Sequence, residues 1–212
     1  MRKWRRRRRQ LYSGTYGSAA LTVDGLYTAG PCTVFDLSPV DGSVIWTNNT
    51  GCEGGGGETP VVASQTLFAP ISGFYSGDFY NAESGALLGG FNYSAPPAVS
   101  ATSIYTLTAS TLQAASLSNN QIAWSFVGDG MLTTSAVVVN SYVFVGSTSG
   151  NLYALDAATG NQLWTENLGA AIAGPATGGS AYQGQTGLAA GDGILVVPAG
   201  NSVTAFVLST NP

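Results

Sequence analysis

The stretch from Val143 to Gly169, VFVGSTSGNLYALDAATGNQLWTENLG, decides the fold. A β-branched and aromatic run at Val143–Val145 precedes a turn at Gly146–Gly150, because Ser, Thr and Gly favour tight turns. Leu152–Asp156 then alternates with a period near two, and a second turn leads to a third strand that carries Trp164. Such a unit alone leaves strand edges and an apolar face uncovered, so it predicts copies of itself beside it.

The copies are found by aligning the chain on the turn residue that stands four positions before each tryptophan. Successive anchors lie 43, 35 and 40 residues apart. A period of about 40 residues with about four short strands per unit is typical of propeller blades. We therefore predict an all-β chain, a β-propeller built of four-stranded antiparallel blades, with about four to five blades. The anchors are Gly42, Gly85, Asn120 and Gly160, and the fourth residues after them are Trp46, Gly89, Trp124 and Trp164.

The run Tyr153–Trp164, YALDAATGNQLW, resembles the repeat of the quinoprotein-like (PQQ-like) β-propellers. The match is close at residues 142–169, looser at 26–48, and weak at 74–91 and 109–126. The resemblance implies a propeller but not the quinone cofactor, because many family members bind none and serve as scaffolds. The non-catalytic branch that it is similar to includes the propeller lipoprotein of outer-membrane protein assembly and related surface repeat proteins.

The repeat predicts which residues hold the blades together. The expected structural anchors are Trp46, Trp124 and Trp164, together with Asp156 and Gly160 of the best repeat. The three tryptophans are expected at equivalent positions in successive blades. On that alignment, replacement of Trp164 by Ala should cost about 3–5 kcal/mol, as for a large aromatic side chain lost from a core.

The repeat also divides the chain into blades. The fifth blade contains only three predicted strands, which leaves one strand edge open. Either the segment Gln10–Tyr16 completes that blade, or the chain is part of a larger ring and completes it with blades that it does not contain; the second interpretation is favoured. The predicted parts are a basic disordered tail or closing strand at 1–17 and blades at 18–50, 59–92, 95–128, 132–168 and 187–208.

Charge is distributed unevenly. All seven basic residues lie between Arg2 and Arg9, whereas the eleven acidic residues lie in the body of the chain, which contains no Lys, Arg or His. A body rich in Ser, Thr, Asn and Gly indicates an extracytoplasmic protein, either periplasmic, at the cell surface or secreted, although no signal segment is visible. The acidic body disfavours nucleic acid. No apolar run reaches the ~18 residues of a transmembrane segment.

Two cysteines, Cys32 and Cys52, stand twenty positions apart, one on a predicted strand of the first blade and one in the connector that follows it. In an oxidising compartment they could form a disulfide, and two free thiols are an equal alternative. A metal site is disfavoured, because the chain has no His and this cysteine spacing matches no zinc pattern.

The residue types in the body exclude most catalytic arrangements. Without His, Lys or Arg there is no Ser-His-Asp or Cys-His set and no cation for an oxyanion. Carboxylates remain, but most of them stand in turns, where Asp caps backbone N–H groups. We therefore predict no catalytic residue, no cofactor and no metal. The carboxylates are Asp24, Asp36, Asp41, Glu53, Glu58, Asp78, Glu83, Asp129, Asp156, Glu166 and Asp192.

These observations predict a non-catalytic extracytoplasmic propeller that acts as a scaffold or binding module for a protein partner or a surface polymer. One alternative is a fragment of a PQQ-dependent dehydrogenase, although the chain lacks the basic groups and the adjacent cysteine pair with which that family holds its quinone. A second alternative is a carbohydrate-binding propeller. It would need exposed aromatic rings, for which the candidates are Tyr75, Phe79, Tyr80 and Phe91, although packing between blades is their favoured role.

Overall fold

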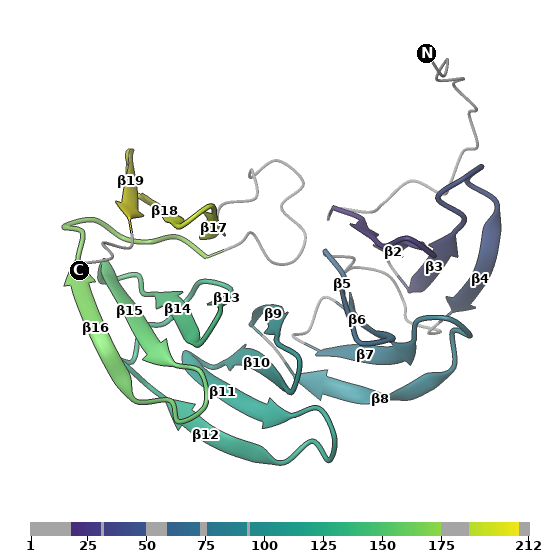
Figure 1. Cartoon of the computed structure of the whole chain (residues 1–212), viewed down its shortest axis with the longest axis horizontal. Coiled ribbons are helices and arrows are strands. Elements are labelled where there is room, and N and C mark those ends of the chain that lie inside the picture. Colours follow the sequence, from purple (N-terminus) through teal and green to yellow (C-terminus); the bar gives the residue numbers. More distant parts are fainter. Residues whose placement is uncertain are drawn as a thin grey trace. The chain divides into compact units, whose positions relative to one another are not determined.

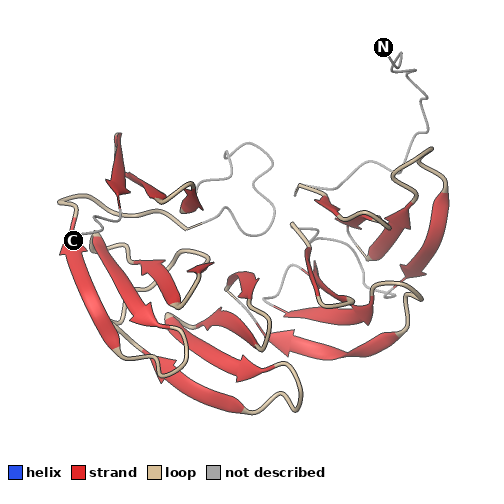
Figure 2. Ribbon diagram, viewed as in Figure 1, coloured by secondary structure: helices blue, strands red, loops and turns tan. Residues whose placement is uncertain are grey.

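The computed structural model describes residues 18–30, 32–49, 59–72, 76–92, 94–174 and 187–207, and all regular structure in these ranges is β-strand (Figure 2). The strands form antiparallel sheets of neighbouring hairpins (Figure 1). The predicted all-β propeller class is thereby confirmed. The tail at 1–17, with the proposed closing strand Gln10–Tyr16, lies outside the described residues.

The chain divides into two compact units, Met1–Phe91 and Asn92–Pro212. The first unit contains two four-stranded sheets, each ordered as a simple meander. The first sheet is β1 (Ala20–Leu21), β2 (Leu26–Gly30), β3 (Thr33–Leu37) and β4 (Val44–Asn49). The second sheet is β5 (Val61–Ala63), β6 (Thr66–Ser72), β7 (Ser76–Asn81) and β8 (Leu87–Asn92).

The second unit contains three sheets with the same meander order. One is β9 (Ala95–Val99), β10 (Ser103–Thr108), β11 (Thr111–Ser116) and β12 (Ile122–Phe126). The next is β13 (Val137–Val139), β14 (Tyr142–Gly146), β15 (Asn151–Asp156) and β16 (Gln162–Asn167). The last has three strands among the described residues, β17 (Ala189–Gly191), β18 (Ile194–Ala199) and β19 (Ser202–Val207).

The turn between the third and fourth strands repeats in four sheets. Its last residue has a left-handed backbone, with φ of 72° at Gly42, 70° at Gly85, 56° at Asn120 and 73° at Gly160. Only Gly and, less readily, Asn adopt this conformation without strain. These four residues are the anchors of the sequence alignment, so the repeat that is visible in the sequence is a repeat of backbone conformation.

A side chain closes each of these turns from four residues earlier. The Asp156 carboxylate accepts backbone N–H groups from Ala158 at 3.1 Å and Thr159 at 2.8 Å, and the Thr159 hydroxyl at 2.8 Å. These hydrogen bonds from Thr159 hold the pKa of Asp156 below its usual value. Oxygens of Ser38, Asn81 and Ser116 accept backbone N–H groups in the equivalent turns.

The third and fourth strands share a second repeated feature, a bulge beside the tryptophan. The register shifts by one residue next to Trp46, Trp124 and Trp164, which pair with Asp36, Ala114 and Ala154. On the other side of the third strand, the second strand of each sheet pairs Tyr27, Tyr105 or Phe144 with the same residue. The cross-strand rows are therefore Tyr27–Asp36–Trp46, Tyr105–Ala114–Trp124 and Phe144–Ala154–Trp164.

The buried side chains lie between consecutive sheets of one unit. In the first unit, Tyr27, Val34 and Trp46 of one sheet pack against Leu67 and Tyr80 of the next. The second unit has two such layers. One layer lies between β9–β12 and β13–β16 and the other between β13–β16 and β17–β19. Face-to-face packing of sheets is how propeller blades bury their apolar surface.

Candidate functional site

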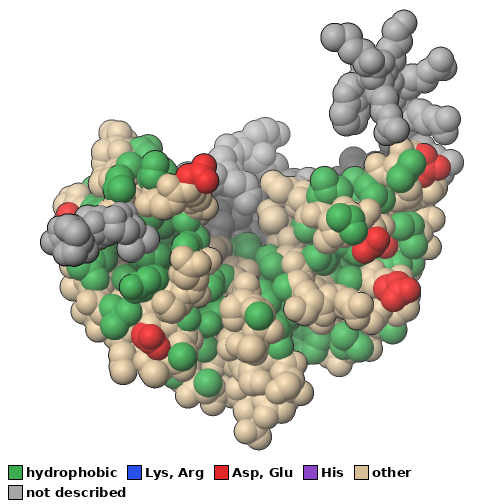
Figure 3. Space-filling view, in the orientation of Figure 1, with side chains coloured by type: hydrophobic (Ala, Val, Ile, Leu, Met, Phe, Trp, Pro, Cys, Tyr) green, Lys and Arg blue, Asp and Glu red, His purple; other side chains and the backbone are tan. Residues whose placement is uncertain are grey.

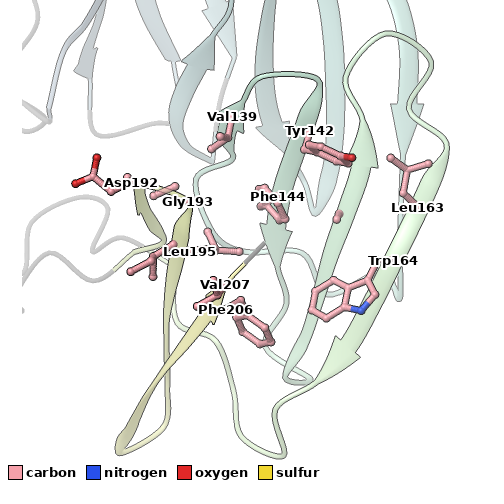
Figure 4. Close-up of a pocket in the computed structure, with 14 residues that line it drawn as sticks. Val139, Tyr142, Phe144, Leu163, Trp164, Asp192, Gly193, Leu195, Phe206 and Val207 are labelled. Atoms are coloured by element: carbon pink, nitrogen blue, oxygen red, sulfur yellow. The ribbon is translucent and has the colours of Figure 1, made fainter. Parts of the chain in front are cut away.

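A cleft of about 380 Å³ lies between the sheets β13–β16 and β17–β19 of the second unit (Figure 4). Aromatic and aliphatic side chains make up most of its lining, and Asp192 in the β17–β18 turn is the one charged residue among them. This composition suits an apolar ligand surface with little polar anchoring. The principal lining side chains are Tyr142, Phe144, Leu163, Trp164, Ile194 and Phe206.

Strand β16 places Leu163 and Trp164 on one wall of the cleft. The Trp164 side chain is 38% exposed and Leu163 is 54% exposed. The fourth strands of other sheets also expose aliphatic side chains, such as Ile45 at 50% and Ile122 at 58%, so Trp164 is the residue that distinguishes β16. From the other wall, Phe206 of β19 meets the indole edge to face, with ring centroids 5.4 Å apart and planes inclined by 74° (Figure 4). The pair forms an aromatic surface that is open to solvent.

The equivalent tryptophans elsewhere are docked on the neighbouring sheet. The Trp46 indole N–H donates to the carbonyl of Ala82 at 2.9 Å, and a Cβ on Gly85 would lie 2.7 Å from its ring. The Trp124 N–H donates to the carbonyl of Ala157 at 3.1 Å, and a Cβ on Gly160 would lie 2.6 Å from its ring. In both docks the turn of the next sheet offers one carbonyl and a residue without a side chain.

The cleft at Trp164 differs from these docks in its chemistry. The Trp164 N–H donates no hydrogen bond to any described residue, and its described ring partner is Phe206. The Tyr105 hydroxyl also donates to the Ala157 carbonyl, at 3.2 Å, whereas Phe144 at the equivalent place in the cleft has no hydroxyl. The same row of residues is thus a closed clamp in two places and an exposed apolar surface in the third.

The predicted anchors of one sequence repeat do not all contact one another in the structure. Asp156, Gly160 and Trp164 belong to one sequence repeat, yet Gly160 contacts Trp124 of the preceding sheet. Phe206 was missed by sequence reasoning. The sequence does contain a signal for it. The run TAFV at 204–207 pairs with β18 as YALD at 153–156 pairs with β14, which puts Phe206 at the position of Leu155 in the repeat.

The described members of the predicted aromatic set pack against other aromatic rings. Phe79 lies 6.0 Å from Phe68 and 6.1 Å from Phe91, between ring centroids. Tyr80 is buried against Trp46. Gly89 stands at the position that Trp occupies in other repeats, and the Phe79 ring lies against it. Phenylalanine rings therefore fill the space that the indole fills in those repeats. Tyr75 lies outside the described residues, as does Cys52. Cys32 is bonded as a half-cystine, while the Cys32–Cys52 pairing stays a prediction.

The body carries no positive charge, and its acidic side chains are scattered over an otherwise uncharged surface (Figure 3). The described residues contain no group of three His, Cys, Asp or Glu side chains suited to a metal ion. The quinone PQQ carries three carboxylates, which would meet Asp192 and no basic group in the cleft. The residues present therefore do not fit that cofactor. No helix capable of crossing a membrane occurs in the ranges that the structure describes.

The comparisons with known proteins agree with this geometry. Residues 109–210 match the family model described as outer membrane protein assembly factor BamB. No curated protein matches the sequence. Among solved structures, BamB from Moraxella catarrhalis has a TM-score of 0.70 at 16% identity, with 92% of this chain and 58% of that chain covered. The chain thus spans less than two thirds of the length of that relative.

Two further structures share the fold. The β-propeller domain of Cps50 (Swd1) from Myceliophteria thermophila has a TM-score of 0.69 at 13% identity, with 94% of this chain and 68% of that chain covered. The computationally designed protein Ika8 has a TM-score of 0.59 at 11% identity, with 91% and 70% covered. The meander sheets, their repeated turn and these matches together identify the chain as a β-propeller repeat protein that resembles the PQQ-like family.

Proposed function

We propose that this chain is a non-catalytic, extracytoplasmic propeller scaffold that binds a protein partner at the cleft of Trp164 and Phe206. The observation that carries the proposal is the contrast between one exposed repeat tryptophan and two docked ones. Exposed aromatic rings that bring large apolar area with little loss of entropy are typical anchors of protein interfaces.

The two docks in this chain indicate what kind of segment suits the cleft. Each tryptophan takes a turn that presents a backbone carbonyl to the indole N–H and a glycine to its ring. A partner segment that presents a backbone carbonyl and a glycine would satisfy the Trp164 N–H in the same way.

The composition and the family match support the proposed location and the proposed lack of catalysis. A body without Lys, Arg or His offers only carboxylates as general bases and no cation for a developing negative charge. The matched family model is described as an outer membrane protein assembly factor, which supports an extracytoplasmic role in binding other proteins.

The test is site-specific photo-crosslinking in the cell that makes the protein. A photoreactive residue at Leu163, which is 54% exposed in the cleft, should give a discrete protein adduct. The matched control places the same residue at Val40, which is 93% exposed in a turn of the first unit. The adduct at position 163 should disappear in the Trp164→Ala variant.

Equal adducts at both positions, or an adduct that survives Trp164→Ala, would overturn the proposed cleft. The indole face can also stack on a sugar ring. Glycan-array binding that is lost in Trp164→Ala would therefore replace the protein partner with a surface polymer.

A further inference from the structure

Asp36 stands in an unusual place for a carboxylate. It occupies the middle of the row Tyr27–Asp36–Trp46, where the equivalent rows of the second unit have Ala114 and Ala154. Its side chain faces the second sheet of the first unit and is 2% exposed. A charged residue has thus replaced a methyl group at a blade interface, which packing alone does not require.

The contacts of Asp36 leave one oxygen unpaired. The carboxylate accepts the backbone N–H of Leu26, but its Oδ1 atom is buried without a hydrogen-bond partner. Gly25 lies directly over that oxygen, and a Cβ there would come within 2.6 Å of the Tyr27 hydroxyl as well. A Cβ at position 25 would clash with both groups, so the close packing here requires glycine.

Asp36 and Tyr27 also line a cavity of about 670 Å³ between the sheets β1–β4 and β5–β8. Two further carboxylates line it, Asp24 from the β1–β2 turn and Glu83 from the turn after β7, and both are exposed. Tyr27 from β2 completes the ionisable groups of the lining. All charged residues that line the cavity are therefore acidic. Its other polar lining residues are Thr22, Ser64 and Gln65.

A buried carboxylate without a counter-charge is unfavourable. Burial raises the pKa of Asp36, and the hydrogen bond from Leu26 lowers it by less. Burial, followed by the nearby Asp36 charge, also raises the pKa of Tyr27. A cation in the cavity would take the place of the proton and relieve both penalties. The body of the chain has no Lys, Arg or His to supply one.

We propose that this cavity binds an organic cation, an ammonium or guanidinium group, with the buried Asp36 carboxylate as its counter-ion and Tyr27 and Thr22 beside it. A divalent metal is the poorer match, because Ca²⁺ needs six to eight oxygen ligands and the described residues contain no suitable cluster of three acidic groups. The site is separate from the Trp164 cleft and does not depend on it.

Two sources could supply a cationic group of this kind. One is a lysine, arginine or amine of another molecule. The other is the run of basic residues between Arg2 and Arg9 of this chain. The described chain begins at Ser18, whose backbone N–H donates to Thr59 just before β5, and β5 contributes Val62 and Ala63 to the cavity wall. Ser18, the first described residue, therefore lies beside the start of β5, which forms part of the cavity wall.

The experiment titrates the full chain with butylammonium and with ethylguanidinium, followed by the side-chain carboxyl ¹³C signals. The Asp36 signal should shift and saturate, while butanol and ethylurea, which are uncharged, should have no effect. Asp36→Asn should weaken binding by about tenfold or more, because the counter-charge is gone. Glu166→Gln, which removes a carboxylate of the other unit that lines neither cavity, should leave binding unchanged.

Proton competition gives a second signature. Below the pKa of Asp36 the affinity should fall about tenfold per pH unit, because the proton and the cation compete for one carboxylate. Equal affinity in Asp36→Asn, or saturation by butanol, overturns the proposal. If Asp36→Asn fails to fold, the Asp36 signal of the unaltered chain still decides, since a signal that does not respond to either cation overturns it.

A variant with Arg5–Arg9 replaced by Gln separates the two sources. Higher affinity for the free cations in that variant means that the chain's own basic run competes for the cavity. Unchanged affinity, with the dependence on Asp36 retained, means that the cation comes from another molecule. Both results support the site and differ only in its occupant.

Discussion

Trp46 and Trp124 differ from Trp164 in what the next sheet offers them. The first two are half-buried and donate their indole N–H groups to the carbonyls of Ala82 and Ala157. Trp164 is 38% exposed, and its described ring partner is Phe206. The same residue at the same position of the same repeat thus serves as a clamp between blades or as an exposed surface. The role of a repeat residue is set by the neighbouring repeat.

The largest expected effect is loss of a docked tryptophan. Trp124→Ala removes a ring packed on Gly160 and leaves the Ala157 carbonyl with one donor fewer, so it should lower the free energy of unfolding by about 3–5 kcal/mol. Trp164→Ala should cost only about 1–2 kcal/mol, because much of its surface is already in water. Guanidinium unfolding of the two variants measures both values.

This second value revises the expectation from the sequence, where Trp164 was given the full cost of a core aromatic residue. The revision rests on the exposure of the side chain. An effect of Trp164→Ala as large as that of Trp124→Ala would erase the distinction between clamp and surface, and with it the main support for the binding cleft.

A matched pair of glycines isolates the contribution of the dock. Gly42 and Gly160 have φ of 72° and 73°, so alanine at either position meets the same backbone penalty of about 1–2 kcal/mol. A Cβ at Gly42 has nothing within 4 Å, whereas at Gly160 it would lie 2.6 Å from the Trp124 ring. Gly160→Ala should therefore cost about 1–3 kcal/mol more than Gly42→Ala.

Urea unfolding of the two alanine variants gives that difference directly, and the Trp124→Ala background provides the control. With the indole removed, the two glycine substitutions should cost the same. A difference that persists without Trp124 would show that the turn itself, and not the dock, distinguishes the two sites.

The smallest expected effect is the pH dependence contributed by Asp156. Its pKa is held below the usual value by hydrogen bonds from Thr159, so the ionised side chain stabilises the turn above about pH 4. That stabilisation is lost as the pH falls below this value toward the lowered pKa of the folded state. Asp156→Asn should flatten this part of the stability curve.

Thermal unfolding between pH 2 and 6 is the measurement, with Glu166→Gln on the exposed face of β16 as the control. If the pH dependence of thermal stability is unchanged in Asp156→Asn, a group other than Asp156 is responsible for it. Because the Asp156 turn carries Gly160, a flatter curve should accompany a slightly looser Trp124 dock.

Much of the fold was predictable because the decisive signal is local. The anchors Gly42, Gly85, Asn120 and Gly160 all adopt a left-handed backbone, which a sequence records directly as Gly or Asn. The spacing of these residues is the spacing of the blades. The bulge before Trp46, Trp124 and Trp164 was not predictable, since it appears only when two strands are paired.

The candidate sites were less predictable for the same physical reason. Gly160 meets Trp124, which is 36 residues earlier, and Phe206 meets Trp164 from a different sheet. In the sequence, Asp36 is one of eleven carboxylates with nothing to distinguish it. Only the structure shows that it faces the second sheet, with Gly25 above its unpaired oxygen. The periodic Gly and Trp residues are visible in the sequence, but the sequence does not show that they contact each other across neighbouring sheets.

By itself, therefore, the sequence determined the repeat, the four-stranded unit, the turn with its left-handed residue and the segregation of charge, because each depends on backbone conformation or on composition. Only the tertiary structure decided which tryptophans are clamps, which one is exposed, and which carboxylate is buried. Those roles depend on the packing of one sheet on the next, where a carbonyl, a glycine or an open space meets each side chain.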